Sequence, residues 1–592
     1  MNVNGWWYMK NGILDFTYTG LAQNANGWWY MRNGALDLTY TGYVYYENQY
    51  YYILNGRFVY TNENMFTIKQ CAIAEISGNS VKIEIDANRN SIMEKMSDSL
   101  YVVLLNSSGT TVMEGAVGTV NADNTFSISA DFVSTDSFKV VSMSKYAIAY
   151  KDSAGFHIIS NTRYIDNPEE MATMNHTYLG YYDNKDTITS KKGIQGISES
   201  DTYDLDVQHV LLNVDVSDLV RMSPTKGFVP YSYKGNTYYF SDLIGLGNTI
   251  YDLNGWGENP AYGRQKKSVN LVICLSWKYD ELSYLIHPAA RIKGAAPYYA
   301  FNMQEENARN TYEALFCYMG EKLGDRKTRV SNWVLGNEVN SCQAWNYSGG
   351  MSLDECVKNY AQAFELLYQG VKRTASTSRV FISLDHCWTA SVAGHSGKEF
   401  LDRLAAYMNQ KDPKMSWNVN YHPYSQPLGR TDFWNDNVNT IQSVNTRFIS
   451  MQNISVLTNY LYNLETYYQK ENGSIRVVIG ELGYSGVLGN VQQEDWQAAA
   501  LGYGYYISLF NTRIDAYIIR AYIDDATETA SDLYLGLKGY WGAEQALKRS
   551  YTIYKYIDTE SSLNYMEPYR IMLGVPAWNA VIPGFDETQI PS

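Results

Sequence analysis

The sequence predicts a multidomain protein whose main domain is an α/β TIM (β/α)₈ barrel, preceded by a small β-sandwich domain and N-terminal β-hairpin repeats. Three observations lead to this prediction: a 22-residue repeat at the start, a middle stretch of alternating apolar and polar residues, and eight short apolar runs separated by helical patterns. A chain of 592 residues is also too long for one ordinary domain. We expect the repeats in residues 1–62, the sandwich-like domain in 63–165 and the barrel in 166–592.

The first 62 residues repeat with a period of 22. A Gly-Trp-Trp-Tyr segment at residues 5–8 recurs at 27–30 and, weakened, at 49–52, and an Asn-Gly pair follows each copy. Asn-Gly favours the type I′ turn, which needs positive φ at both of its central residues. Each unit is therefore predicted to be a small hairpin that buries its aromatic rings by stacking on the next unit.

These repeats resemble the cell-wall-binding repeats of Gram-positive surface proteins. The resemblance implies an extracellular or cell-wall-associated protein, with a cell-wall or surface glycan as the candidate partner of the repeats. Because the chain starts inside a repeat unit, we expect no signal peptide in it. Two roles stay open for Trp6, Trp7, Trp28 and Trp29: packing between repeats, or direct contact with sugar.

Residues 63–165 alternate between apolar and polar side chains in the manner of half-buried strands. We expect strands at 81–85, 100–105, 125–129 and 139–141, with a turn at 106–109. The spacing suits a small β-sandwich. No cluster of carboxylates or histidines stands out, so a spacer role is favoured and carbohydrate binding is the alternative.

From residue 166 onward, strands alternate with helices. The helical patterns include residues 307–319 and a stretch after Ser352, which forms a predicted capping box with Glu355. An inserted hairpin is expected at 231–240, with its turn at Gly235-Asn236. The predicted barrel strands are 207–214, 269–275, 297–301, 333–335, 380–384, 417–421, 477–479 and 514–519.

Two of these strands end on a glutamate. Asn337-Glu338 follows the fourth run and Glu481 follows the seventh. A carboxylate at the tip of a buried strand is costly to desolvate unless the site uses it. In such barrels the active site lies at the carboxyl ends of the strands, and a glycosidase needs two carboxyl groups flanking the bond that it cleaves.

The segments Leu335-Gly336-Asn337-Glu338 and Ile479-Gly480-Glu481 resemble those of glycoside hydrolase clan A, the retaining (β/α)₈ glycosidases. The resemblance implies cleavage of O-glycosidic bonds in a poly- or oligosaccharide by double displacement. Glu338 would then be the acid/base, Glu481 the nucleophile, and Asn337 a ligand of the sugar 2-hydroxyl. The alternative is a non-catalytic carbohydrate- or wall-binding surface protein on the same barrel.

Further candidate substrate-binding residues follow the predicted strands. We expect Tyr421 or His422 to be the partner of the nucleophile, because both lie at the end of the sixth run. For Trp277 and Trp345, packing under a loop is an open alternative to sugar contact. For His386 the alternative is a hydrogen-bonded structural pair with Asp385, and for His422 it is a role in shaping the turn at Pro423. The other candidates are Tyr424 after the sixth run, His386 and Trp388 after the fifth, Trp277 after the second and Trp345 after the fourth.

The end of the eighth run departs from the clan. Arg520-Ala521-Tyr522 stands where clan members often carry a tryptophan. Arg520 is expected either to recognise an anionic group or, preferably, to pair with Asp524 or Asp525.

Composition excludes several classes of function. A net charge of −14 and a pI near 5.1 argue against a nucleic-acid partner, which needs clustered basic residues. No apolar run is long enough to predict a membrane span. Seven histidines and six cysteines lack metal-ligand spacing, so we expect neither a metal nor another cofactor. A Cys342–Cys356 disulfide is the alternative to isolated buried thiols.

Overall fold

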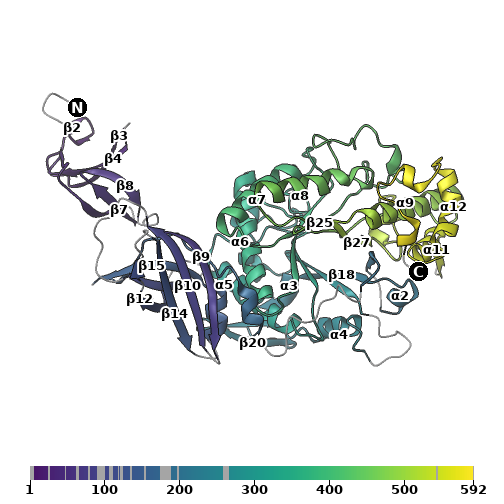
Figure 1. The fold of residues 1–592 in the computed structure, drawn as a ribbon, viewed down its shortest axis with the longest axis horizontal. Coiled ribbons are helices and arrows are strands. Elements are labelled where there is room, and N and C mark those ends of the chain that lie inside the picture. Colours follow the sequence, from purple (N-terminus) through teal and green to yellow (C-terminus); the bar gives the residue numbers. More distant parts are fainter. Residues whose placement is uncertain are drawn as a thin grey trace. The chain divides into compact units, whose positions relative to one another are not determined.

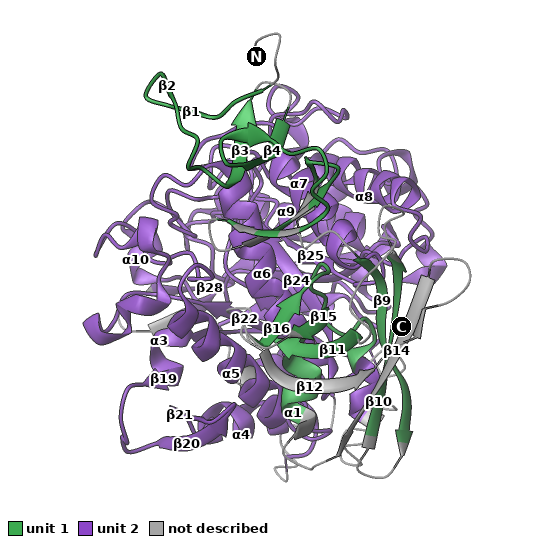
Figure 2. Ribbon diagram, turned by 90° about the vertical axis from the view of Figure 1, so that its left-hand side faces the viewer, with its two compact units in different colours: residues 1–168 green, residues 169–592 purple. Residues whose placement is uncertain are grey.

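The structure is a computed structural model, and its described residues form two compact units, Met1–Pro168 and Glu169–Ser592 (Figure 1, Figure 2). The described residues are 6–24, 27–46, 49–61, 66–77, 80–89, 100–105, 111–117, 119–120, 125–133, 137–152, 155–173, 188–196, 199–257, 266–541 and 544–590.

The repeats form hairpins, and their Asn-Gly turns have the conformation that the sequence predicts. Asn11 and Gly12 have φ of 52° and 80°, and the pairs 33–34 and 55–56 have φ of 50° with 73° and 50° with 75°. The N–H of Tyr8 donates to the carbonyl of Gly34, as does the N–H of Tyr30 to Gly56, each at 2.8 Å, so the same bond links successive units. The strands are β1 (Met9–Lys10), β2 (Ile13–Leu14), β3 (Gly20–Asn24), β4 (Gly27–Arg32), β5 (Ala35–Leu36), β6 (Gly42–Tyr46), β7 (Gln49–Leu54) and β8 (Arg57–Thr61).

Two four-stranded antiparallel sheets follow the repeats. One sheet has the order β13-β14-β10-β9 and the other β12-β11-β15-β16. Three of the predicted strands fall within β10, β11 and β14, and the predicted turn at 106–109 lies outside the described residues. The strands are β9 (Phe66–Ser77), β10 (Ser80–Arg89), β11 (Leu100–Leu105), β12 (Thr111–Val117), β13 (Thr119–Val120), β14 (Thr125–Val133), β15 (Lys145–Asp152) and β16 (Gly155–Ile158).

The strand predicted at 139–141 is wrong. These residues lie in the helix α1 (Ser137–Met143). Val141 and Met143 are buried there, and the hydroxyl of Tyr146 donates to the carbonyl of Val141 at 3.1 Å. Burial of this face outweighs the weak strand preference of the two adjacent valines.

The second unit contains a closed barrel of eight parallel strands, which confirms the predicted fold class. Leu211, Val272, Val334, Phe381 and Ile518 contribute to one buried cluster, so the barrel is filled by side chains. In order around the barrel, the strands are β17 (Lys192–Gln195), β18 (His209–Asp215), β22 (Ser268–Cys274), β23 (Asn332–Leu335), β24 (Arg379–Leu384), β25 (Asn418–Tyr421), β26 (Val477–Ile479) and β27 (Ile514–Ile519).

The first barrel strand, β17, has no counterpart among the predicted runs. Its sequence, Lys-Gly-Ile-Gln, holds a single large apolar residue, and the buried Lys192 instead forms an ion pair with Asp558 at 2.6 Å. The run at 297–301, predicted as the third strand, is not part of the barrel. Tyr299, Ala300 and Phe301 are buried within the loop between β22 and α5 (Glu306–Leu323), where Tyr299 and Phe301 form isolated bridges.

Helices cover the outside of the barrel, as Figure 1 shows for α6 to α9. The capping box between Ser352 and Glu355 starts α6, as predicted, and the predicted helix at 307–319 lies within α5. The helices are α2 (Glu199–Asp204), α3 (Val216–Leu219), α4 (Ile244–Leu253), α5 (Glu306–Leu323), α6 (Leu353–Lys372), α7 (Gly397–Lys411), α8 (Ser455–Tyr467), α9 (Val491–Phe510), α10 (Ala526–Thr529), α11 (Arg549–Tyr556) and α12 (Ser562–Met572). Among the described residues, none of these helices combines the length and apolarity needed to cross a bilayer.

The second unit also contains two small antiparallel sheets that are not part of the barrel. The predicted hairpin forms from β20 (Phe228–Tyr233) and β21 (Asn236–Ser241), and β21 also pairs with β19 (Val220–Arg221). Its turn is Lys234-Gly235, with φ of 46° and 78°, one residue earlier than predicted. The second sheet pairs β28 (Lys538–Trp541) with β29 (Glu544–Leu547).

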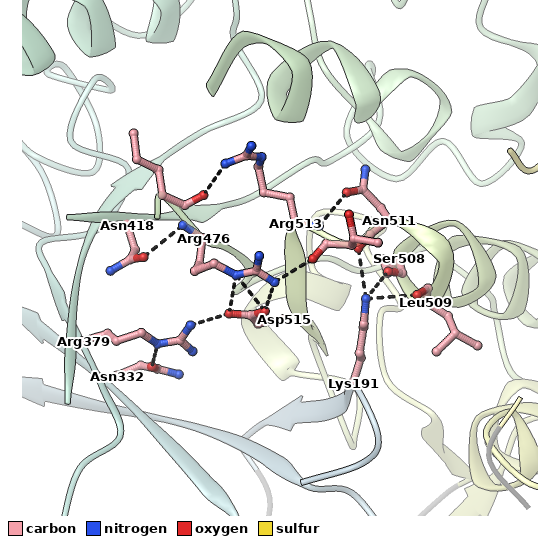
Figure 3. A network of polar contacts seen from close by, with 12 residues as sticks. Lys191, Asn332, Arg379, Asn418, Arg476, Ser508, Leu509, Asn511, Arg513 and Asp515 are labelled. Atoms are coloured by element: carbon pink, nitrogen blue, oxygen red, sulfur yellow. Dashed lines mark hydrogen bonds and ion pairs between the residues drawn. The ribbon is translucent and has the colours of Figure 1, made fainter. Parts of the chain in front are cut away.

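A polar network joins the amino ends of the strands (Figure 3). Asp515 accepts hydrogen bonds from Arg379 and Arg476, and Arg379 also donates to Asn332 at 3.0 Å. Burial opposes the charge of Asp515, but the two arginines outweigh it and lower the pKa of Asp515 to about 2. Lys191 donates to the carbonyls of Ser508, Leu509 and Asn511. This end of the barrel therefore carries ion pairs together with hydrogen bonds from a lysine to backbone carbonyls.

Candidate active site

A cavity of about 430 Å³ lies among the loops that follow the barrel strands. It is lined by both predicted catalytic glutamates, Glu338 after β23 and Glu481 after β26. Five more of the predicted site residues line it: Asn337, Trp345, His386, Tyr424 and, from the eighth strand, Arg520.

A tight turn presents Glu338. Gly336 has φ of 72° and Glu338 itself has φ of 45°, a left-handed conformation that is rare for a residue with a Cβ atom. The N–H of Glu338 donates to the hydroxyl of Ser383 on β24 at 3.0 Å, and the N–H of Val339 donates to the Ser383 carbonyl. The neighbouring strand therefore holds the turn in place.

His422 contacts the carboxylate of Glu338. Its Nδ1 lies 3.0 Å from Glu338 Oε1, and both side chains are buried. The amide nitrogen of Asn420 lies 3.4 Å from Nε2, which in this orientation makes Nε2 the acceptor and leaves the proton on Nδ1. The prediction that His422 or Tyr421 contacts Glu481 is therefore wrong for His422, whose partner is Glu338.

The environment raises the pKa of both members of this pair. Burial raises the pKa of Glu338, the hydrogen bond from His422 opposes that rise, and the charges of Asp385 and Glu481 add to it. Burial lowers the pKa of His422, but its hydrogen bond to Glu338 and the charge of Glu481 outweigh burial and raise it overall. The pair is suited to holding a proton next to the cavity.

Glu481 accepts a hydrogen bond from Tyr424. The Tyr424 hydroxyl lies 3.0 Å from Glu481 Oε1. Burial, and then the charge of Glu481, raise the pKa of Tyr424 well above its usual value, so this hydroxyl stays protonated and donates a hydrogen bond to Glu481. Gly480, immediately before Glu481, lies against Asn420: a Cβ atom at this glycine would be 1.6 Å from Asn420 Oδ1. The backbone that carries Glu481 therefore packs directly on Asn420, the residue whose amide contacts His422.

Arg520 forms an ion pair with Glu528, which lies on the short helix α10 after the last barrel strand. The expected pairing of Arg520 with Asp524 or Asp525 is wrong. Asp524 pairs with Lys548 at 2.7 Å, and Asp525 caps α10 by accepting the N–H groups of Thr527 and Glu528. Both Arg520 and Glu528 line the cavity.

Four predicted substrate-binding residues do not line the cavity, and one of them is His422, which contacts Glu338 instead. Tyr421 is fully buried, and its hydroxyl has no partner among the described residues. Trp388 is also fully buried and donates its ring N–H to the carbonyl of Val444 at 2.9 Å, so it packs instead of facing a sugar. Trp277 follows the third strand of the barrel, not the second, and its ring N–H donates to Asp280 at 2.8 Å.

Sequence reasoning missed several residues of the cavity wall. Gln195 ends the unrecognised strand β17, so a glutamine after a buried isoleucine was its only signal. Glu528 belongs to a four-residue helix with no motif beyond its aspartate cap. Asn213, Cys274 and Tyr298 also line the cavity.

Two groups of described residues bring metal-ligand atoms within 4.8 Å of one another. Cys342, Cys356 and His395 form the first, with the two sulfur atoms 3.9 Å apart, a separation that shows two thiols and no disulfide. Asp385, His386 and Cys387 form the second. The Asp385 carboxylate already accepts from the Asn340 amide and the Cys387 N–H. Its hydrogen bonds therefore fasten the loop that follows Glu338.

In the repeats, the aromatic rings contact one another and a cation. The rings of Trp6 and Trp29, one period apart, meet edge to face at 5.1 Å. The guanidinium of Arg57 lies over the Trp29 ring, 5.5 Å from its centroid. Tyr8 stacks on Tyr18 at 3.8 Å, and the equivalent pair one repeat later does the same. Packing between repeats therefore involves at least Trp6 and Trp29.

Comparisons with known proteins match two families. A family described as "Family of unknown function (DUF5722)" matches residues 184–581, and the choline-binding repeat matches residues 1–15, 17–37 and 39–57. No curated protein matches the chain.

Among solved structures, the chain is similar to several glycosidases. A Bacteroides uniformis β-glucuronidase is 9% identical with a TM-score of 0.34, over 83% of this chain and 51% of the enzyme, so the chain spans about half of that protein. A Croceicoccus marinus glucosidase is 10% identical with a TM-score of 0.39, over 62% of this chain and 67% of that one. A Thermotoga maritima β-glucosidase is 13% identical with a TM-score of 0.36, over 62% of this chain and 85% of that one.

Proposed function

The chain belongs to DUF5722, a family of unknown function, and we propose that it is a retaining glycoside hydrolase of the clan A type, acting on a poly- or oligosaccharide. One observation carries the proposal: Glu338 and Glu481, from the ends of the fourth and seventh barrel strands, line one cavity in contrasting surroundings. Glu338 faces a histidine and has a raised pKa, whereas Glu481 accepts a hydrogen bond from a tyrosine. Two carboxyl groups with such different environments suit the roles of acid and nucleophile.

In the first step, Glu338 donates its proton to the glycosidic oxygen while Glu481 attacks the anomeric carbon. The C–O bond to the leaving group breaks, and a bond forms between the sugar and a Glu481 oxygen. Tyr424 holds Oε1 of Glu481 and so orients the carboxylate. Asn337, which lines the cavity beside Glu338, is the proposed donor to the sugar 2-hydroxyl.

In the second step, Glu338 accepts a proton from a water molecule that attacks the same carbon. The bond to Glu481 breaks, so the product keeps the configuration of the substrate. His422, 3.0 Å from Glu338, stays close enough to respond to each change in the charge of that carboxyl group. His386 and Trp345 are the proposed contacts with the rest of the substrate, because both line the cavity.

The test is a panel of aryl glycosides and polysaccharides, assayed with the wild type and with Glu481→Gln. We expect the variant to lose about a thousandfold or more in kcat/KM on every active substrate. A 2-deoxy-2-fluoro glycoside of the active sugar should label Glu481 covalently, as mass spectrometry of the digested protein would show. The exposed Glu281, which does not line the cavity, provides the control Glu281→Gln. Unchanged activity in Glu481→Gln would exclude this nucleophile, and binding without hydrolysis by the wild type would favour the non-catalytic alternative.

We further propose that the repeats attach the protein to the bacterial surface, which would make it extracellular or cell-wall associated. The match to choline-binding repeats supports this proposal, and so does the cation held over Trp29, because quaternary ammonium groups bind to aromatic rings in the same way. Retention on a choline-bearing resin, eluted by free choline, would test it. The variant Trp29→Ala should be retained less strongly, and equal retention would contradict a role for this ring.

A further inference from the structure

The wall of the cavity contributed by the last strand is a pair of opposite charges. Arg520 directly follows β27, and Glu528 reaches it from α10, with both side chains partly exposed to the cavity. The Nε of Arg520 donates to Glu528 Oε1, and the other two guanidinium nitrogens make no hydrogen bond with described residues. On the glutamate, Oε2 is buried and likewise has no partner among the described residues. The pair therefore presents guanidinium N–H groups that are not used by Glu528, together with a partly exposed carboxylate, next to Glu481.

The charge of Arg520 is already balanced within the protein. Burial disfavours its positive charge, but the charges of Glu481 and Glu528 outweigh burial and raise its pKa. A carboxylate on the substrate would have to approach Arg520 past these two glutamates and lose its own hydration. Neutral hydroxyl groups have no such penalty, since an arginine donates to them and a carboxylate accepts from them.

We propose that Arg520 and Glu528 together bind hydroxyl groups of the sugar that occupies the reacting position, and that they select neutral pyranosides over uronic acids. This inference rests on the proposed glycosidase function and concerns the substrate class of the same site. A site that hydrogen-bonds a substrate hydroxyl discriminates strongly, because an unsuitable ligand leaves its buried polar groups unpaired.

The test compares matched pairs of ligands: methyl glucoside with methyl glucuronide, and the galacto- and manno-configured equivalents. Calorimetry measures binding of each ligand, and 4-nitrophenyl versions measure hydrolysis. For the pair that binds best, the wild type should prefer the neutral sugar by about tenfold or more. Glu528→Gln keeps the shape of the side chain but frees the charge of Arg520, so the preference should fall by about tenfold. Glu281→Gln, an equal change in net charge outside the cavity, should leave the preference unchanged.

A second variant gives the opposite prediction. Arg520→Gln removes the cation and leaves the carboxylates, so the preference for the neutral sugar should widen. Thermal melts of all variants check that they are folded. A wild type that prefers the uronide, an unchanged preference in folded Glu528→Gln, or binding of neither member of any pair would overturn the inference. Binding with the expected preferences but without hydrolysis would support the inference and contradict the proposed catalytic function.

Discussion

The Nδ1 atom of His422 lies 3.0 Å from Oε1 of Glu338, and this contact links the ends of the sixth and fourth strands of the barrel. Ser383 of the fifth strand, between them, holds the backbone N–H of the same glutamate. Three neighbouring strands therefore fix one carboxyl group. The ionisation of Glu338 then depends on a histidine that does not itself line the cavity.

Removing this histidine should move the pH dependence of the reaction. The hydrogen bond from His422 lowers the pKa of Glu338, whereas burial, Asp385 and Glu481 raise it. In His422→Asn the raising influences remain, so the pKa of Glu338 should increase. The acid must be protonated to act, so the basic limb of kcat/KM against pH should shift to higher pH. A pH–rate profile measures this shift. His157→Asn, on β16 in the first unit, should not move the limb, and a shift to lower pH in His422→Asn would contradict the prediction.

Removing the hydroxyl that holds Glu481 should slow the reaction. Tyr424→Phe deletes a hydrogen bond to a charged carboxylate, a contact that contributes about 1.5–3 kcal/mol. We expect kcat to fall by about tenfold or more, with little change in the melting temperature. Steady-state kinetics on the best substrate of the panel measure the effect. Tyr462→Phe, an exposed position on α8, is the matched control, and equal rates for both variants would show that the Tyr424 hydroxyl is not needed.

A methyl group at Gly480 should disturb both carboxyl groups. The added Cβ would lie 1.6 Å from Oδ1 of Asn420, which is fully buried and has no space to retreat without moving His422. Overpacking of this kind costs about 1–3 kcal/mol of unfolding free energy, and we expect kcat/KM to fall as well. Gly245→Ala is the control, because nothing lies within 4 Å of its Cβ position and a helical alanine should stabilise α4. Chemical denaturation and kinetics measure the two variants, and a fully active, fully stable Gly480→Ala would refute the contact.

The polar network at the opposite end of the barrel should affect stability and its dependence on pH. Because the pKa of Asp515 is about 2 in the folded protein, against about 3.9 in an unfolded chain, its ionisation contributes about 2–3 kcal/mol at neutral pH. This contribution is fully present above about pH 5 and is lost progressively as the pH falls through about 4 toward about 2. Asp515→Asn should therefore lower the free energy of unfolding at pH 7, and the difference from wild type should shrink in acid.

Denaturant titrations at several pH values measure this effect. Asp354→Asn removes an exposed partner of Arg403 and should change the free energy of unfolding very little. A difference between Asp515→Asn and wild type that stays constant from pH 7 to acid would contradict the linkage.

The fold was largely predictable because apolar runs and hairpin turns are local signals. The three Asn-Gly turns and the capping box at Ser352 form as predicted. The predicted set of barrel strands contains two errors that cancel in the numbering: it lacks β17 and it includes residues 297–301, which lie in a loop. Glu338 and Glu481 therefore received the right strand numbers. Apolarity alone distinguishes neither a strand that buries a lysine nor a loop that buries aromatic rings.

The surroundings of the two glutamates were harder to predict. Which of Tyr421, His422 and Tyr424 faces the cavity depends on how the chain turns after β25, and neighbouring residues there point to different partners. The pairing of Arg520 with Glu528 depends on the path of a loop, and two nearer aspartates were equally plausible from the sequence. Such choices are made by tertiary contacts that one sequence does not reveal.

The left-handed backbone of Glu338 implies a trade between activity and stability. A glutamate in this conformation costs about 1–2 kcal/mol, which asparagine or glycine would largely avoid. Replacing it by either residue should give an inactive protein that melts at a higher temperature than the wild type. The fold thus retains a locally unfavourable residue at its centre, and the variant that cannot turn over a substrate would be the sturdier molecule in which to capture one.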